Sequence, residues 1–288
     1  MTGALGHILT DIKLAHSVFA LPFAGLGLLV GTRGQPPTAL LLLQFAAAML
    51  LARSAAMGWN RLADRRLDAT NPRTATRALP AGRVSPRAMA AFTLACAAGF
   101  VAVAGSLGRS CLLLSPLVLL VLWAYSLSKR FTSLAHLVLG LALGLAPPAA
   151  YLAARGSLQA DAAIALWLGL SVLLWVAGFD VIYACQDVEH DRREGLRSLP
   201  ARLGVRPALR VAAALHAGML AALAATARAA GFGPLGWAAI GLVGMLLAAE
   251  HALVRGGNLA RVNSAFFTLN GVVSLVFGGL VAADLLWP

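Results

Sequence analysis

The chain has 288 residues, of which 60% are hydrophobic and only 12% charged, and its mean hydropathy is +0.81. Soluble domains carry roughly a quarter charged residues, so this composition excludes a water-soluble globular protein and indicates that lipid is the solvent. The net charge of +12 does not indicate nucleic-acid binding, because the basic residues interrupt apolar runs and form no patch interleaved with aromatic side chains.

Nine apolar segments approach the length that a bilayer requires, about 20 residues each. They predict an all-α, polytopic membrane protein whose nine transmembrane helices form a bundle around a central cavity. The predicted spans are 14–31, 38–58, 88–107, 111–127, 134–154, 162–183, 208–229, 234–254 and 263–286. We expect the first span to be a retained helix, since it continues directly into further spans.

The 23 lysines and arginines predict the orientation of these spans. With the N-terminus in the cytoplasm, 18 of them lie on the cytoplasmic side, including seven arginines in 61–87 and six in 192–210. Four lie on the opposite side, namely Arg33, Arg109, Arg155 and Arg228. Because cytoplasmic loops carry the excess of positive charge, the sequence predicts a cytoplasmic N-terminus. We expect a bacterial inner-membrane protein with its site facing the cytoplasm.

The acidic residues are concentrated in two short stretches. Seven of the 11 lie there, at cytoplasmic ends of predicted helices: Asp64, Asp68, Asp180, Asp187, Glu189, Asp191 and Glu194. The first stretch follows the second predicted span, and the other follows the sixth, four spans later. This spacing suggests an internal repeat, 38–154 and 162–286, within a single domain, 1–288. A purely structural membrane protein would have no reason to gather its acids at two sites.

The spacing of the two acidic motifs predicts metal binding. The first motif consists of Asn60, Asp64 and Asp68. The second consists of Asp180, Asp187 and Asp191, with Tyr183 beside them. On a continuous helix each set follows one face. Two rows of carboxylates that face each other near lipid would repel each other, at a cost in free energy. Divalent cations bound between them would lower that cost. Carboxylate oxygens suit Mg²⁺.

Basic residues of the same cytoplasmic level surround both motifs: Arg73, Arg77, Lys129, Arg130, Arg192, Arg193 and Arg197. Carboxylates that hold Mg²⁺ among arginines and lysines form a diphosphate site. In an apolar bundle this predicts an isoprenyl diphosphate, with its headgroup at the cytoplasmic mouth and its tail among the helices. The alternative is a set of weak, solvated salt bridges at loop ends, which two motifs of regular spacing on one membrane side argue against.

Three segments in this order resemble the UbiA superfamily of intramembrane prenyltransferases. Residues 60–82 (NRLADRRLDATNPRTATRALPAG) resemble that family's NxxxDxxxD helix and the loop after it. Residues 180–204 (DVIYACQDVEHDRREGLRSLPARLG) resemble its second aspartate motif. Residues 125–130 (YSLSKR) resemble the tyrosine–lysine element between the two.

The resemblance implies a Mg²⁺-dependent aromatic prenyltransferase with two metal ions, one held by each motif, and with loops 59–87 and 184–207 capping the site. The residues implied to grip the diphosphate are Arg73, Arg77, Lys129, Arg130 and Arg197, with Tyr125 and Tyr183 near its ester oxygen. Departure of the diphosphate would give an allylic carbocation or loose ion pair. An aromatic ring would then attack, and Asp187, Asp191 or the released diphosphate would remove the ring proton.

The aromatic acceptor is predicted from residues 12–24 (IKLAHSVFALPFA) and the loop 71–82. Both resemble the futalosine-route menaquinone (MqnP-like) branch, which implies 1,4-dihydroxy-6-naphthoate. The alternative is 4-hydroxybenzoate, for ubiquinone synthesis. Lys13 and Arg53 are candidates for binding the acceptor carboxylate. No nucleic-acid partner is expected.

Two other classes of membrane protein are the alternatives to this prediction. CDP-alcohol phosphotransferases are also rich in aspartate, but the chain lacks their string of a DG motif, an AR pair and closely spaced aspartates. A transporter is disfavoured because the acids lie at one membrane face and not at the midplane.

Overall fold

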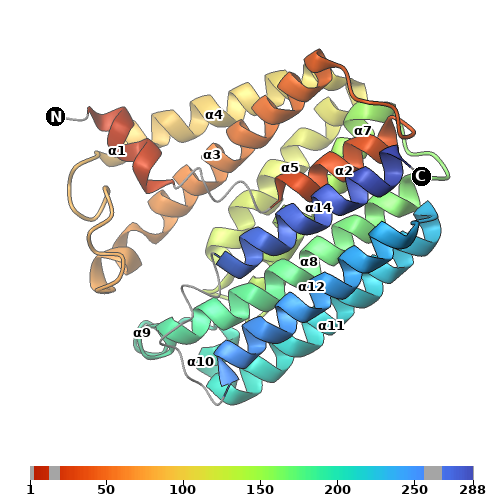
Figure 1. Cartoon of the computed structure of the whole chain (residues 1–288). Coiled ribbons are helices and arrows are strands. Elements are labelled where there is room, and N and C mark those ends of the chain that lie inside the picture. Colours follow the sequence, from red (N-terminus) through yellow and green to blue (C-terminus); the bar gives the residue numbers. More distant parts are fainter. Residues whose placement is uncertain (1–2, 13–19, 256–267, 288) are drawn as a thin grey trace. The chain divides into compact units, whose positions relative to one another are not determined.

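The computed structural model describes residues 3–12, 20–255 and 268–287, and its secondary structure is helical throughout those ranges (Figure 1). The longer helices are α1 (Ala4–Asp11), α2 (Leu21–Gly31), α3 (Ala39–Thr70), α4 (Pro86–Leu107), α5 (Arg109–Ser128), α6 (Ala135–Gly144), α7 (Ala146–Arg155), α8 (Ala162–Ala184), α11 (Val205–Ala230), α12 (Pro234–Leu253) and α14 (Asn270–Leu286). Between α8 and α11 lie the 3-10 turn η2 (Cys185–Asp187) and the short helices α9 (Val188–Arg193) and α10 (Leu199–Leu203). The all-α prediction is confirmed for these residues.

Seven of the helical segments are long and apolar enough to cross a membrane. Two further apolar helices, α2 and α14, are shorter, and the rest of their predicted spans (14–19 and 263–267) falls outside the described residues. Large apolar side chains point outward from these segments, among them Leu43, Leu113 and Leu120, which are 69%, 66% and 62% exposed. Lipid satisfies such a surface and water does not, so the chain is an integral membrane protein. The count of nine spans and the orientation stay predictions.

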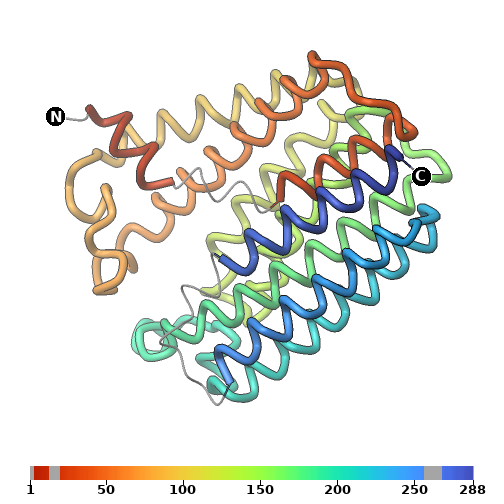
Figure 2. Tube along the Cα trace, in the orientation of Figure 1, coloured from red at the N-terminus to blue at the C-terminus, as the bar shows by residue number. Residues whose placement is uncertain are grey.

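The chain divides into two compact units, each described by itself. Unit 1 comprises residues 1–17 and 39–127. In it α3 and α4 run side by side, as the trace in Figure 2 shows. Small residues such as Ala55 and Ala97 let the two helices approach, with Phe100 and Leu119 filling the same cluster. Ile8 of α1 and Ile12 just after it form a second cluster with the segment that follows α3.

Unit 2 comprises residues 18–38 and 128–288, and α8 supplies much of its core. Trp175 of α8 is fully buried, with Phe23 of α2 at 5.4 Å between ring centroids, and Phe23 in turn stacks on Phe277 of α14 at 5.0 Å. A buried polar chain joins α8, α14 and α12: Trp175 Nε1 donates to Asn270 Oδ1 at 2.7 Å, and Asn270 Nδ2 donates to Glu250 Oε1 at 2.8 Å. Polar groups in lipid-embedded helices need such internal partners.

Glycines allow the closest helix approaches in unit 2. Gly27 and Gly31 of α2 lie four residues apart and meet the backbone of α7 at Pro147 and Tyr151. Gly140 of α6 likewise meets the carbonyl of Leu173 in α8. Small residues at four-residue spacing are the usual means by which helices pack in lipid, where backbones approach through van der Waals contact.

The two loops predicted to cap the site contain more helix than expected. Residues 59–70 are the last turns of α3, so the first predicted loop begins only at Asn71. The Asn71-Pro72 pair ends the helix, because a proline disfavours helical backbone at the residue before it. The predicted loop 184–207 contains η2, α9 and α10. Whether these segments cap a site stays a prediction.

Candidate active site

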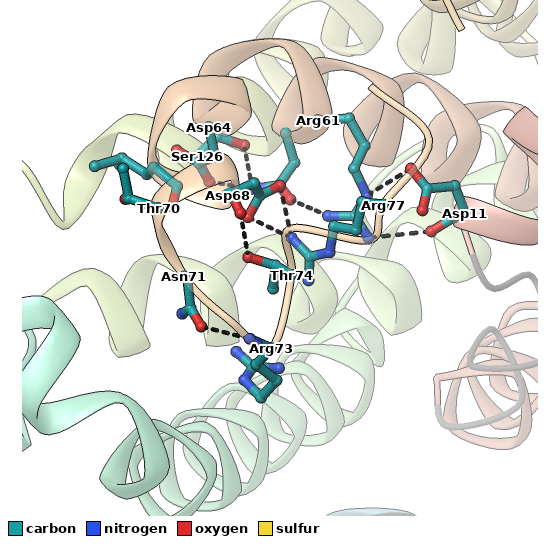
Figure 3. Close-up of polar contacts among 12 residues, drawn as sticks. Asp11, Arg61, Asp64, Asp68, Thr70, Asn71, Arg73, Thr74, Arg77 and Ser126 are labelled. Carbon is teal, nitrogen blue, oxygen red and sulfur yellow. Dashed lines mark hydrogen bonds and ion pairs between the residues drawn. The ribbon is translucent and has the colours of Figure 1, made fainter. Parts of the chain in front are cut away.

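The first aspartate motif lies along the end of α3, in unit 1 (Figure 3). Its members occupy successive turns, as the four-residue spacing predicted. Asn60 Nδ2 donates to Asp64 Oδ2 at 2.9 Å and to Ser126 Oγ of α5 at 3.4 Å. Ser126 directly follows Tyr125, so the end of α5 that carries the predicted tyrosine adjoins this motif. The structure therefore brings together parts of two of the three predicted segments.

Asp68 and Arg77 form a close ion pair in this motif. Arg77 Nη1 donates to both carboxylate oxygens of Asp68, at 2.7 and 2.8 Å. Thr74 Oγ1 donates to the Asp68 backbone carbonyl at 3.0 Å, which folds the segment after α3 back onto the helix. The sequence assigned Asp68 to a metal and Arg77 to the diphosphate, and here the two side chains neutralise each other.

The segment after α3 is an ordered turn. Asn71 Oδ1 accepts a hydrogen bond from the backbone N–H of Arg73 at 2.9 Å, and its carbonyl accepts from Thr74 and Ala75. This side chain mimics a backbone turn, which is why asparagine is common at such positions. The Arg73 side chain is exposed, while Ala78 further along the segment is buried.

Sequence reasoning gave no role to Arg61 and Asp11, which complete this cluster. The Arg61 side chain is 4% exposed, and its Nη1 donates to Asn60 Oδ1 at 2.9 Å. Its Nη2 donates to the Asp11 carbonyl at 3.1 Å, and its Nε lies 3.6 Å from Asp11 Oδ2. One residue after Asn60, Arg61 points about 100° away from the motif's face, so spacing alone did not connect it to the motif.

The second aspartate motif belongs to unit 2 and is not one straight helix. α8 ends at Ala184, η2 follows, and α9 begins at Val188. Asp180 lies on α8, Asp187 closes the 3-10 turn and Asp191 lies on α9. The prediction that a continuous helix aligns the three carboxylates is therefore wrong, because a 3-10 turn winds about 120° per residue and α-helix about 100°.

Asp180 is paired with a histidine that the sequence analysis did not assign to the site. His136 Nδ1 of α6 lies 2.6 Å from Asp180 Oδ2, and His136 Nε2 lies 3.3 Å from the backbone N–H of Leu199. A backbone N–H can only donate, so Nε2 is the acceptor and Nδ1 carries the proton that Asp180 accepts. The one sequence feature that could have assigned His136 to the site was its position at the start of a predicted span, at the same predicted membrane depth as Lys129.

The predicted basic residues of unit 2 are brought together by backbone contacts. The Arg197 backbone N–H donates to the Lys129 carbonyl at 2.7 Å, and Arg197 Nη1 donates to the Phe131 carbonyl at 2.9 Å. The side chains of Arg130 and Arg197 are exposed. The loop after α5 is thus attached to the segment that follows the second motif.

The remaining predicted residues are dispersed. Tyr183 packs beside a small apolar cluster at the end of α8. Arg53 lies on α3, two turns before Asn60, and is half-buried. Lys13 lies outside the described residues.

The existing partners of the carboxylates indicate which of them could bind a metal ion. Asp191 is 3% exposed, and its Oδ2 is buried with no hydrogen-bond partner among the described residues. An anionic oxygen buried without a donor is costly, so this carboxylate fits a cation ligand. Within the described ranges no three acidic, histidine or cysteine side chains converge as a metal site. Mg²⁺ binds through one or two carboxylates together with waters and phosphates, so the donor set still suits it. The two predicted ligand triads stay predictions.

The UbiA prenyltransferase family matches residues 20–272 of this chain. The chain belongs to the UbiA prenyltransferase family. It is therefore a prenyltransferase, as predicted. The 4-hydroxybenzoate octaprenyltransferase of Aeromonas salmonicida is 34% identical to it over 248 residues, covering 85% of this chain and 83% of the relative. The enzyme of the same name from Xanthomonas campestris is 33% identical over 252 residues, covering 87% and 81%.

Solved structures of UbiA homologues have the same fold. The apo structure of a UbiA homologue from Aeropyrum pernix superposes with a TM-score of 0.85 at 36% identity, covering 94% of this chain and 98% of the homologue. A UbiA homologue from Archaeoglobus fulgidus bound to GPP and Mg²⁺ gives a TM-score of 0.68 at 17% identity, covering 97% and 99%. The second likeness shows the fold alone.

Proposed function

We propose that this prenyltransferase transfers a polyprenyl group from polyprenyl diphosphate to 4-hydroxybenzoate in a Mg²⁺-dependent reaction. The names of its relatives carry the choice of acceptor, because at 34% and 33% identity over most of both chains they are 4-hydroxybenzoate octaprenyltransferases. They favour this acceptor over the naphthoate predicted from residues 12–24, part of which lies outside the described residues. The GPP and Mg²⁺ of the Archaeoglobus homologue support the donor class and the metal.

Each motif is proposed to hold one Mg²⁺, on the cytoplasmic side of a bacterial inner membrane. The ligands would be Asn60, Asp64 and Asp68 in the first motif and Asp180, Asp187 and Asp191 in the second. When bound, Mg²⁺ neutralises the diphosphate and so stabilises the charge that builds on this leaving group. The Oδ2 atom of Asp191 supports this assignment, because it is buried and has no hydrogen-bond partner among the described residues. His136 orients Asp180 in the way that hydrogen-bonded neighbours orient metal-binding carboxylates.

The other predicted site residues would bind the prenyl donor and accept the proton that the aromatic ring loses. Four basic side chains would contact the diphosphate oxygens: Lys129, Arg73, Arg130 and Arg197. Two tyrosines, Tyr125 and Tyr183, would donate hydrogen bonds near the ester oxygen. Asp187, which is half-buried, would accept the ring proton, unless the released diphosphate takes it. The apolar helices exclude water, which would otherwise capture the allylic cation. Lys13 and Arg53 stay the proposed partners of the acceptor carboxylate.

Arg77 is proposed to exchange partners when the donor arrives. It neutralises Asp68 in the present structure, at 2.7 Å. A cation bound at Asp68 would release the guanidinium, whose fork matches diphosphate oxygens.

Arg77→Ala should therefore raise the KM for polyprenyl diphosphate by roughly 10- to 100-fold. This is the change expected when one charge-assisted hydrogen bond to the diphosphate is lost. The KM for the acceptor should change by less than about twofold, because the assigned role is specific to the diphosphate. Steady-state kinetics in proteoliposomes would measure both constants. Arg83→Ala is the matched control, since this exposed arginine of the same segment bonds only to the Thr76 carbonyl among the contacts described for it. Equal losses for donor and acceptor would contradict the role of Arg77.

The function is tested with the purified protein in proteoliposomes, a long-chain polyprenyl diphosphate and Mg²⁺. 4-Hydroxybenzoate and 1,4-dihydroxy-6-naphthoate are offered side by side, with EDTA as the metal control. We expect prenylation of 4-hydroxybenzoate that EDTA abolishes. Prenylation of the naphthoate alone would overturn the proposed acceptor and restore the prediction made from residues 12–24. Transfer that continues undiminished in EDTA would overturn the metal dependence.

A further inference from the structure

A buried arginine lies directly beside the asparagine of the first motif. Arg61 is 3% exposed, and Figure 3 shows its guanidinium turned between the motif and Asp11. Its partners are Asn60 Oδ1 at 2.9 Å and the Asp11 carbonyl at 3.1 Å. A guanidinium at this depth stays charged, so it needs partners with fixed positions.

Two neighbours of opposite kind fix the orientation of the Asn60 amide. The Arg61 guanidinium can only donate hydrogen bonds, so the amide must present Oδ1 to it. The Asp64 carboxylate can only accept, so the amide must present Nδ2 to it, at 2.9 Å. The reversed amide would place a donor against a donor and an acceptor against an acceptor. Asn60 is therefore held as a hydrogen-bond donor to Asp64. Its Oδ1 already accepts from Arg61, so it would bind Mg²⁺ through its second lone pair.

Asp11 anchors the arginine from a different element. Its carbonyl and its carboxylate both face Arg61, and the carboxylate oxygen Oδ2 also accepts from the backbone N–H of Ala78 at 3.3 Å. Ile8 and Ile12 on either side of Asp11 are buried in the same cluster as Ala78. Asp11 thus attaches α1 both to α3 and to the segment that carries Arg77.

We propose that Arg61 is a positioning residue that, anchored by Asp11, orients Asn60 and through it the Asp64 carboxylate for a divalent cation. This inference rests on the proposed metal-dependent function. Arg61 itself contacts neither the metal nor the substrate. Without it Oδ1 of Asn60 loses its donor, and the amide is held only through Nδ2, by Asp64 and Ser126, so the position of the Asp64 carboxylate is less fixed.

The sign of the effect separates positioning from simple electrostatics. Arg61 is a cation that directly follows Asn60 of the anionic first motif. By Coulomb's law alone, the removal of its charge would strengthen the binding of a metal cation at this motif. If it acts by positioning, its removal weakens cation binding. Outer partners of metal ligands typically change metal affinity by about 10- to 100-fold.

The experiment measures Mn²⁺ binding to the purified full-length protein in detergent, from the EPR signal of free Mn²⁺, with competition by Mg²⁺. Arg61→Lys keeps the buried charge and its pairing with Asp11, and removes the fork that reaches both Asn60 and Asp11. Arg61→Gln with Asp11→Asn removes both charges together, so that no buried charge is left alone. Arg65→Gln is the matched control, because Arg65 is an exposed cation one turn further along α3. Thermal unfolding of each variant reports whether it folds.

We expect Arg61→Lys to weaken Mn²⁺ binding at the first motif by about 10-fold or more, and the double variant to do the same. Arg65→Gln should leave it within about twofold of the wild type. Unchanged or tighter Mn²⁺ binding by folded Arg61→Lys would overturn the inference, as would a wild-type protein that binds no Mn²⁺. The proposed function fails separately, when the wild-type protein binds Mn²⁺ and yet prenylates no 4-hydroxybenzoate.

Discussion

Asp64→Asn and Asp187→Asn should each reduce prenyl transfer by at least about 10²-fold while leaving the protein folded. Asparagine has the shape of aspartate but no charge, so the substitution removes a Mg²⁺ ligand and with it part of the stabilisation of the departing diphosphate. Losing one such charge-stabilising contact typically costs about 10²- to 10³-fold in rate. At position 64 the new amide can still offer its oxygen to Asn60 Nδ2, which now donates to Asp64 Oδ2 at 2.9 Å.

Single-turnover rates in proteoliposomes, with thermal unfolding in parallel, would measure this effect. Glu189→Gln is the control, because it removes an exposed acid from α9 that is assigned no ligand role. It should keep activity within about twofold. Near-full activity in both aspartate variants would disprove the two-metal site. Loss in only one of them would restrict the essential metal site to the motif that carries that substitution.

Gly27→Ala should lower the melting temperature by roughly 2–10 °C, as expected when about 1–3 kcal/mol of overpacking is forced into a closely packed contact. A Cβ at Gly27 would overlap the Pro147 carbonyl oxygen and lie 2.9 Å from the Pro147 Cα. Both are backbone atoms, so no side chain can rotate away to make room. The contact joins α2 to α7 within unit 2, and α2 would have to shift along its length.

Gly25→Ala is the matched control on the same helix. A Cβ there meets nothing within 4 Å. Both substitutions gain the same helix propensity, up to about 1 kcal/mol, so the difference between them isolates the contact with Pro147. Thermal unfolding of the purified protein in detergent should give a melting temperature for Gly25→Ala that equals or exceeds the wild type. If Gly27→Ala unfolds at the same temperature as Gly25→Ala, the close approach of α2 and α7 is wrong.

Local patterns in the sequence predicted the parts of this protein that depend on local structure. In the described residues helix occurs in each predicted span, although 134–154 contains two helices, α6 and α7. The four-residue spacing placed Asn60 and Asp64 on adjacent turns, where they are hydrogen-bonded. The second predicted span ends at residue 58, and α3 continues beyond it. Hydropathy measures only the stretch that suits lipid, whereas α3 continues to Thr70 through arginine, leucine and alanine, which favour helix in water as well.

Side chains that meet across the fold could not be predicted in this way. Arg61 and Asp11 are separated by 50 residues, and His136 and Asp180 by 44. No periodicity connects such pairs, since their contact depends on how whole helices pack. The 3-10 turn at Cys185 was also missed, because the residues around it have no proline or glycine to mark a break in the helix. The present partners of the motif residues, such as Arg77 for Asp68 and His136 for Asp180, were likewise not predicted.

The length of α3 has a consequence for how the enzyme meets its donor. At 1.5 Å per residue its 32 residues extend about 48 Å, while the hydrocarbon layer is about 30 Å thick. Because the apolar part of α3 precedes Asn60, we expect the last turns, with Asn60, Asp64 and Asp68, to stand at the level of the lipid headgroups. A polyprenyl diphosphate can approach them by lateral diffusion, with its chain always in lipid, and avoids a transfer to water that would cost about 0.8 kcal/mol for every CH₂. The concentration that governs turnover is then the mole fraction of donor in the bilayer, and diluting it with inert phospholipid should slow the reaction even when its bulk concentration is constant.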